Sequence, residues 1–164
     1  SILSLSVSAQ KPTKAEKAAQ LEQEFQQTRQ LIESNHFQFE LNRVYPQDGQ
    51  DLSRFNPRGK FVITDSVAKG TLPFFGRAYS LPYGEGGGIE FDGVMKDQSL
   101  KIEHKKKRKI LIYRFSITAK NDTYQISMEI SGGGNCSVNL NSNNRAQISY
   151  SGTVSPVKDE TGKS

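Results

Sequence analysis

The residues of this chain best suited to chemistry form a run of five cations, Lys105-Lys106-Lys107-Arg108-Lys109. Residues 101–109 hold six of the 22 lysines and arginines and one of the 17 acids. The net charge of +5 therefore belongs to this segment, because the remaining 16 bases and 16 acids cancel. Such a run can contact an anionic envelope polymer or a lipid head group. The more ordinary alternative is a solvated turn between two strands, whose like charges discourage edge-to-edge aggregation.

A second candidate site is the stretch TLPFFGRAYSLPYGEGGGIEFDG, residues 71–93. It surrounds one arginine with aromatic residues: Phe74, Phe75, Arg77, Tyr79 and Tyr83. Because binding residues concentrate on loops held by a rigid scaffold, this stretch can form a rim that faces a ligand. Alternatively, the aromatic residues close one end of the β structure as packing, and Arg77 pairs with Glu90 or Asp92. The residues leave both interpretations open.

Motifs for the common enzyme and metal chemistries are absent from the sequence. The chain has two histidines and one cysteine, with no C-x-x-C or H-E-x-x-H, so we expect neither a metal site nor a cofactor. No P-loop, G-x-G-x-x-G or G-x-S-x-G occurs. Glu90 and Asp92 share one face of a strand, so a small hydrolase that uses acids and Arg77 is an alternative function. We expect Cys136 to point into a sheet as a small apolar side chain.

The sequence predicts one α-helix, which comes before the strands that carry the candidate site residues. Residues 14–34 predict it, because apolar positions recur at steps of three and four. The expected buried face holds Ala18, Leu21, Phe25, Thr28 and Ile32. Thr13 and Glu16 have the spacing of a capping box.

From His36 onward the apolar period changes to two, which predicts strands. The expected inward residues are Phe37, Phe39, Leu41, Tyr113, Phe115, Ile117, Ala119, Tyr124, Ile126, Met128, Ile130, Val138, Leu140, Ala146, Ile148, Tyr150 and Val154. The separators are rich in the Gly, Asn, Asp and Ser that tight turns need. One-sided alternation with short connections is typical of antiparallel meanders. We therefore expect a mainly β fold with one N-terminal α-helix and about eight antiparallel strands, as a barrel (lipocalin-like in one version) or a sandwich.

The chain divides into four parts by composition. Residues 1–9, SILSLSVSA, end in the small-residue pattern that precedes a signal-peptidase cut, so we interpret them as the remnant of a secretory signal. Residues 10–35 carry the helix, 36–155 the β domain and 156–164 a polar tail that we expect to be disordered. A periplasmic or secreted location follows; the alternative is a cytosolic protein with a disordered N-terminus. No apolar stretch reaches the roughly 18 residues of a membrane span.

The stretch SVAKGTLPFFGRAYSLPYGEGGGIEFDG resembles the signature of a family of secreted Bacteroidetes proteins described as a domain of unknown function. The resemblance extends from the helix to Val154 and is most specific at LPFFGRAY and GIEFDG. It implies an envelope or secreted location and supplies no activity or catalytic residues. Asp65-Ser66-Val67 also resembles an O-glycosylation acceptor of Bacteroidetes secretory proteins, so Ser66 is a candidate for modification. The alternative for Ser66 is an ordinary turn.

These features together predict a non-enzymatic, monomeric, periplasmic or secreted β-domain. Its expected partner is a hydrophobic or envelope-derived small ligand, or a protein. Nucleic acid is not expected, because the basic residues occupy one short segment rather than a whole face. The alternatives are the small hydrolase and a purely structural envelope protein.

Overall fold

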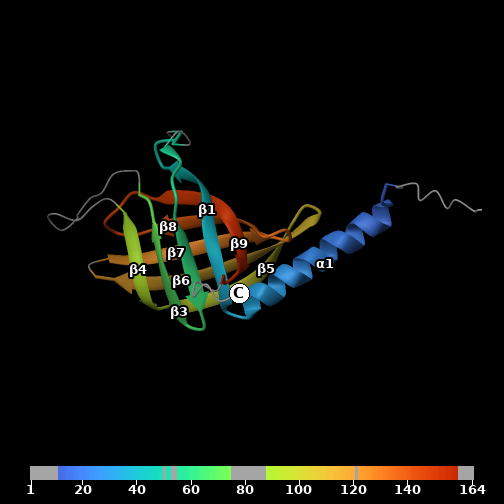
Figure 1. Cartoon of the computed structure of the whole chain (residues 1–164), viewed down its shortest axis with the longest axis horizontal. Helices are drawn as coiled ribbons and strands as arrows, with labels where there is room; N and C mark the ends of the chain where they lie inside the picture. Colours follow the sequence, from blue (N-terminus) through green and yellow to red (C-terminus); the bar gives the residue numbers. More distant parts are fainter. Residues whose placement is uncertain (1–10, 50, 53–54, 75–87, 121, 159–164) are drawn as a thin grey trace, which may run out of the picture.

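The computed structural model describes residues 11–49, 51–52, 55–74, 88–120 and 122–158. These contain one helix, α1 (Lys14–Glu33), and one sheet of nine antiparallel strands. The strands are β1 (His36–Pro46), β2 (Lys60–Thr64), β3 (Val67–Leu72), β4 (Ile89–Val94), β5 (Lys96–Lys105), β6 (Arg108–Ala119), β7 (Asp122–Ser131), β8 (Asn135–Asn141) and β9 (Ile148–Pro156). The sheet curls into a half-barrel, and α1 extends away from it (Figure 1).

The strand order is β4-β3-β2-β1-β9-β8-β7-β6-β5, so two meanders join where β1 pairs with β9. The mainly antiparallel β fold is confirmed, with nine strands and an architecture between the barrel and the sandwich. Both edge strands, β4 and β5, are consecutive in sequence and separated only by Met95. One residue is too short a link for a hairpin between them. The Met95 N–H instead donates to the Ser66 carbonyl oxygen at 2.7 Å, so the chain turns here and the barrel does not close.

Aromatic side chains pack the concave side of the half-barrel. The Phe61 ring lies 5.2 Å from that of Phe39, 5.7 Å from Phe91 and 6.3 Å from Phe115 between centroids. The inward residues expected in β6–β9 are buried, apart from the half-buried Ala119. Burial of this apolar surface on folding is the main stabilising contribution, at about 25 cal/mol per Å².

The first strand departs from the simple alternation. Gln38 points outward but is 2% exposed, because the chain after β9 covers it: the Lys158 N–H donates to its Oε1 at 3.3 Å. A register shift between Leu41 and Arg43 then moves the buried positions from odd to even numbers, so that Val44 is buried and Leu41 only half-buried. A β-bulge adds one residue to one strand and thereby reverses which residues face inward.

The helix begins and ends as the sequence predicts, but its buried face is shorter. Thr13 and Glu16 form the capping box, with both hydrogen bonds at 3.1 Å. Phe25, Thr28 and Ile32 are buried. Ala18 is exposed and Leu21 is 64% exposed, so the predicted buried face is wrong for these two. The reason is that the N-terminal half of α1 extends beyond the sheet (Figure 1). In the part of the chain that the structure describes, no helix has the length and apolar character needed to cross a membrane.

Thr28→Val tests how α1 is held against the β domain. The Thr28 hydroxyl donates to the Gly132 carbonyl oxygen at 2.6 Å, across the β7–β8 turn. Valine keeps the shape and leaves that carbonyl without this donor, so we expect a loss of about 1 kcal/mol and a Tm lower by roughly 2–4 °C. Gln27→Ala, at an exposed position of the same helix, is the control and should melt like the parent. Equal melting of all three proteins would show that this bond does not stabilise the fold.

Candidate functional site

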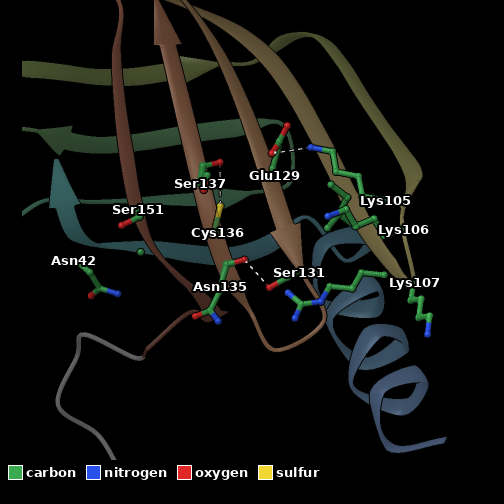
Figure 2. Close-up of a pocket in the computed structure, with 13 residues that line it drawn as sticks. Asn42, Lys105, Lys106, Lys107, Glu129, Ser131, Asn135, Cys136, Ser137 and Ser151 are labelled. Carbon is green, nitrogen blue, oxygen red and sulfur yellow. Dashed lines mark hydrogen bonds and ion pairs between the residues drawn. The ribbon is translucent and has the colours of Figure 1, made fainter. Parts of the chain in front are cut away.

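A groove of about 920 Å³ lies on the outer face of the sheet, where the β5–β6 turn meets β7, β8, β9 and β1. We call it the basic-turn groove. It is lined by Asn42, Lys105, Lys106, Lys107, Arg108, Ile110, Glu129, Ser131, Asn135, Cys136, Ser137, Ser151 and Gly152. Figure 2 shows Lys105, Lys106 and Lys107 at one end of this set and Asn42 with Ser151 at the other.

The structure divides the predicted basic run between two surfaces. Lys109 faces α1: its Nζ lies 2.8 and 3.0 Å from the Glu22 carboxylate oxygens and 5.5 Å from the Phe25 ring centroid. This hydrogen bond lowers the pKa of Glu22. Lys105 borders the groove, with its Nζ 3.6 Å from Glu129 Oε2.

The other three cations of the run are exposed at the turn. Lys106, Lys107 and Arg108 form no ion pair with any acid among the described residues. Lys106 has a φ of +56°, a conformation that costs a side-chain-bearing residue free energy and that favours glycine or asparagine in two-residue hairpin turns. The sequence thus places a cation where turn geometry alone would favour a smaller residue.

Polar side chains form the floor of the groove in a row across three neighbouring strands. Glu129 of β7 pairs in register with Ser137 of β8, and Ser137 pairs with Ser151 of β9. The bulge in β1 then brings Asn42 to the far end, next to Gly152. The floor therefore offers hydroxyl and amide groups, with a single carboxylate at the end near the turn.

The thiol of Cys136 does not add reactivity to the groove. Its side chain is 3% exposed and points into the core, as predicted. Burial raises its pKa far above the ordinary value, so the thiol stays protonated at neutral pH. Within the described residues, no group of three or more His, Cys, Asp or Glu side chains is placed to hold a metal ion.

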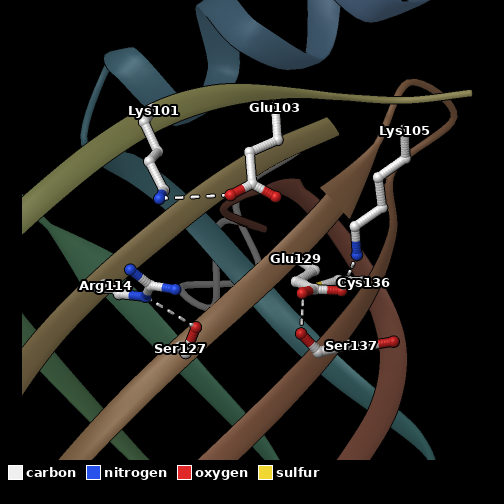
Figure 3. Close-up of polar contacts among 8 residues, drawn as sticks. All are labelled: Lys101, Glu103, Lys105, Arg114, Ser127, Glu129, Cys136 and Ser137. Atoms are coloured by element: carbon white, nitrogen blue, oxygen red, sulfur yellow. Dashed lines mark hydrogen bonds and ion pairs between the residues drawn. The ribbon is translucent and has the colours of Figure 1, made fainter. Parts of the chain in front are cut away.

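Two further cations, Lys101 and Arg114, lie on the outer face beside the groove (Figure 3). Lys101 Nζ lies 3.3 Å from Glu103 Oε1 on β5. On the next two strands, Arg114 Nε donates to Ser127 Oγ at 3.3 Å. Serine is neutral, so among the described residues the positive charge of Arg114 has no acid partner, and the cations of this face that lack acid partners include Arg114 on the sheet as well as those at the turn.

A second groove, of about 720 Å³, lies on the outer face of β1–β3. Val62, Val67 and Val157 contribute apolar surface to it. Two of its lysines have acid partners, since Lys69 Nζ lies 3.8 Å from Asp92 and Lys158 Nζ lies 3.3 Å from Glu40. Its cations are therefore more fully compensated than those of the basic turn.

The structure describes one of the five residues of the predicted aromatic rim. Phe74 is half-buried and packs against the core. Phe75, Arg77, Tyr79 and Tyr83 lie outside the described residues, so the rim stays a prediction.

The acids proposed for a hydrolase lie on the outside of β4. Glu90 and Asp92 are both exposed, and Asp92 pairs with Lys69. Ser66 is exposed in the turn between β2 and β3, a position accessible to modification, and its glycosylation likewise stays a prediction.

Arg145 is a structural residue that the sequence did not reveal. Its side chain is 4% exposed, and its guanidinium lies 4.8 Å from the centroid of the Phe74 ring. Its Nη2 donates to the Gly88 carbonyl oxygen at 3.3 Å, and its Nε lies 3.9 Å from Asp122 Oδ2. Arg145 thus contacts two residues, Phe74 and Gly88, that lie at least 57 positions before it in the sequence. Nothing in its local sequence, a turn of Asn and Ser residues, distinguishes it from a solvated arginine.

Comparisons with known proteins identify a family and a fold. The family model described as "Domain of unknown function (DUF4251)" matches residues 19–154. The crystal structure of a DUF4251 family protein from Bacteroides eggerthii superposes with a TM-score of 0.59 at 21% identity, covering 85% of this chain and 91% of that chain. No curated protein matches the chain. The expected resemblance to a domain of unknown function is confirmed, and the secreted location stays a prediction.

Proposed function

Since the chain belongs to the DUF4251 family, which is described only as a domain of unknown function, we propose its role from its geometry. The chain is a non-enzymatic β-domain that binds an anionic ligand in the basic-turn groove. One observation carries this proposal: three cations without acid partners among the described residues, Lys106, Lys107 and Arg108, border a groove. A secreted or periplasmic location, which residues 1–9 predict, forms part of the proposal.

Packing of the described interior supports a ligand on the outside of the sheet. The cluster around Phe61 occupies the concave side, where a lipocalin-like domain would hold an apolar molecule. The proposal therefore keeps an envelope-derived ligand, requires that this ligand be anionic, and sets aside the hydrophobic one. Exposed cations attract anions over about 8–10 Å at physiological salt, so binding should weaken as salt rises.

A binding role also fits the contacts better than a hydrolytic one. Catalysis needs titratable groups that converge on a reacting atom. Glu90 and Asp92 are exposed on β4, and Asp92 pairs with Lys69 at 3.8 Å on the same exposed surface. The basic turn needs no such convergence, because charge attraction alone suffices to hold an anion.

Reversing the charge of Lys105, Lys106 and Lys107 together to Glu tests the proposal. The parent should bind fluorescent oligoglutamate at low salt, and the variant should bind it at least tenfold more weakly with a flatter salt dependence. Stability should change little, since surface substitutions usually cost within about ±0.5 kcal/mol each. Fluorescence anisotropy across a salt titration measures both quantities.

A matched control carries the same charge change away from the groove. Lys11, just before α1, and Lys14 and Lys17 in its first turn are exposed, and their reversal to Glu lowers the net charge equally. This variant should retain most of the parent's affinity. If it loses as much as the turn variant, net charge rather than the groove governs binding, and the proposal is wrong.

A further inference from the structure

The basic-turn groove contains two kinds of groups, which together define a class of ligand. We infer that the groove binds an acidic polysaccharide: a chain of sugar rings with spaced carboxylates. This rests on the proposed function and adds the identity of the ligand. The cations at the turn supply the attraction for carboxylates, and the floor supplies hydrogen bonds for hydroxyl groups.

The floor suits hydroxyl groups because its side chains both donate and accept. Serine hydroxyls and asparagine amides have this property, as sugar hydroxyls do. Ser137 and Ser151 lie next to each other in register on β8 and β9, with Asn135 and Asn42 also lining the groove. A polyanion that lacks both hydroxyl and N–H groups offers the floor acceptors alone, and a polypeptide adds only one backbone N–H per residue, whereas each sugar ring carries several hydroxyls that both donate and accept.

Glu129 further favours spaced charges over dense ones. Its carboxylate accepts but does not donate, and it lies within the groove, 3.6 Å from Lys105 Nζ. A carboxylate of the ligand placed next to Glu129 would be repelled, so the ligand must present a neutral group at that point. A sugar hydroxyl placed there donates to it instead, while a carboxylate farther along reaches the turn.

The shape of the groove fits a short stretch of a linear chain. The row from Glu129 to Ser151 crosses three neighbouring strands, which places its ends about 10 Å apart at the usual strand spacing. The volume of about 920 Å³ lies within the range of roughly 300–1,000 Å³ for ligand sites. Ile110 and the aliphatic parts of the lysines also line the groove and offer apolar surface to the C–H face of a ring.

A flat anionic membrane fits the groove less well. A planar surface would contact the turn but not the floor between the strands. The large exposed apolar residues of the described chain are Leu21, Tyr45, Phe55, Val67 and Val94, and none of them lines the groove. Insertion into lipid thus has no apolar anchor at this site.

The experiment compares ligands that differ in their backbone, in their charge or in being presented on a lipid surface. The probes are oligogalacturonate, oligoglutamate with the same number of carboxylates, fully methyl-esterified oligogalacturonate and vesicles containing phosphatidylglycerol. The parent should bind oligogalacturonate at least tenfold more tightly than either soluble comparison probe, and should bind the vesicles no better than oligoglutamate. Calorimetric or anisotropy titration at fixed salt gives the dissociation constants.

Removing the floor hydroxyls separates the sugar contribution from the charge contribution. Ser137→Val with Ser151→Val should weaken oligogalacturonate binding at least tenfold and leave oligoglutamate binding unchanged. Ser127→Val with Ser155→Val is the matched control, because Ser127 on β7 and Ser155 on β9 lie on the same sheet outside the groove lining. The control should bind oligogalacturonate like the parent, and thermal melting of all variants should confirm that they fold.

Three other results would contradict the polysaccharide assignment, each in a different way. Equal affinity for oligogalacturonate and oligoglutamate, with no effect of the serine variants, would leave an anion site and remove the polysaccharide. Binding to vesicles alone would replace the polysaccharide with a lipid surface. Binding of no anionic probe would remove this inference and the proposed function together.

Discussion

Replacing Arg145 with alanine is expected to lower the free energy of unfolding by about 3–5 kcal/mol, because it breaks a buried ion pair from one side. Asp122, whose side chain is 11% exposed, would keep its carboxylate without the neighbouring cation. The guanidinium contact with the Phe74 ring and the hydrogen bond to the Gly88 carbonyl would also be lost. For a chain of this length the Tm should fall by roughly 6–20 °C.

Thermal melting followed by circular dichroism measures this effect. Arg114→Ala is the matched control, since Arg114 is exposed and its described contact is a hydrogen bond to Ser127. It should change stability by no more than about 0.5 kcal/mol. Adding Asp122→Asn to Arg145→Ala should recover part of the loss, because the unpaired buried charge is then gone. Melting of Arg145→Ala at the parent's temperature would show that this cluster does not hold the fold.

Gly152→Ala is expected to have an effect of similar size through the backbone. A Cβ atom at Gly152 would overlap the Glu40 carbonyl oxygen and lie 2.8 Å from Phe39 Cε2. A backbone atom cannot move aside as a flexible side chain can, so β1 and β9 would have to separate where they join the two meanders. Overpacking in a core costs 1–3 kcal/mol and sometimes more, and we expect at least about 3 kcal/mol here.

Gly133→Ala provides the comparison for this variant, because a Cβ atom there would have no neighbour within 4 Å. Urea unfolding should place its midpoint close to that of the parent and that of Gly152→Ala well below. The loss at Gly152 should appear with an unchanged m value if the native state only loses stability. A Gly152→Ala protein as stable as the parent would mean that β1 and β9 do not approach as closely as the structure places them.

Local patterns in the sequence determine much of this fold. The capping box at Thr13 and Glu16, the strand alternation of Tyr124, Ile126, Met128 and Ile130, and the inward direction of Cys136 are all confirmed. These features follow from interactions within a few residues or from a period of two along one strand, so the chain encodes them without reference to distant segments.

Tertiary contacts decide what the local patterns leave open. The bulge after Leu41 reverses the burial pattern of β1, and the apolar face of α1 is buried only where the sheet reaches it, so Leu21 is exposed. Arg145 resembles any turn arginine in sequence and becomes buried because Phe74 and Gly88 meet it from far along the chain.

In the candidate site, too, the sequence determines some features and tertiary contacts determine the others. The sequence by itself determined that five cations are consecutive in the chain, because charge is a property of the residues. Only the tertiary structure decided that Lys109 would face α1 while Lys106 and Lys107 border a groove floored by Ser137 and Ser151. The physical reason is that a groove forms only where residues from several strands are brought together. Its walls come from β5, β6, β7, β8, β9 and β1, whose register and curvature depend on long-range pairing that no short segment encodes.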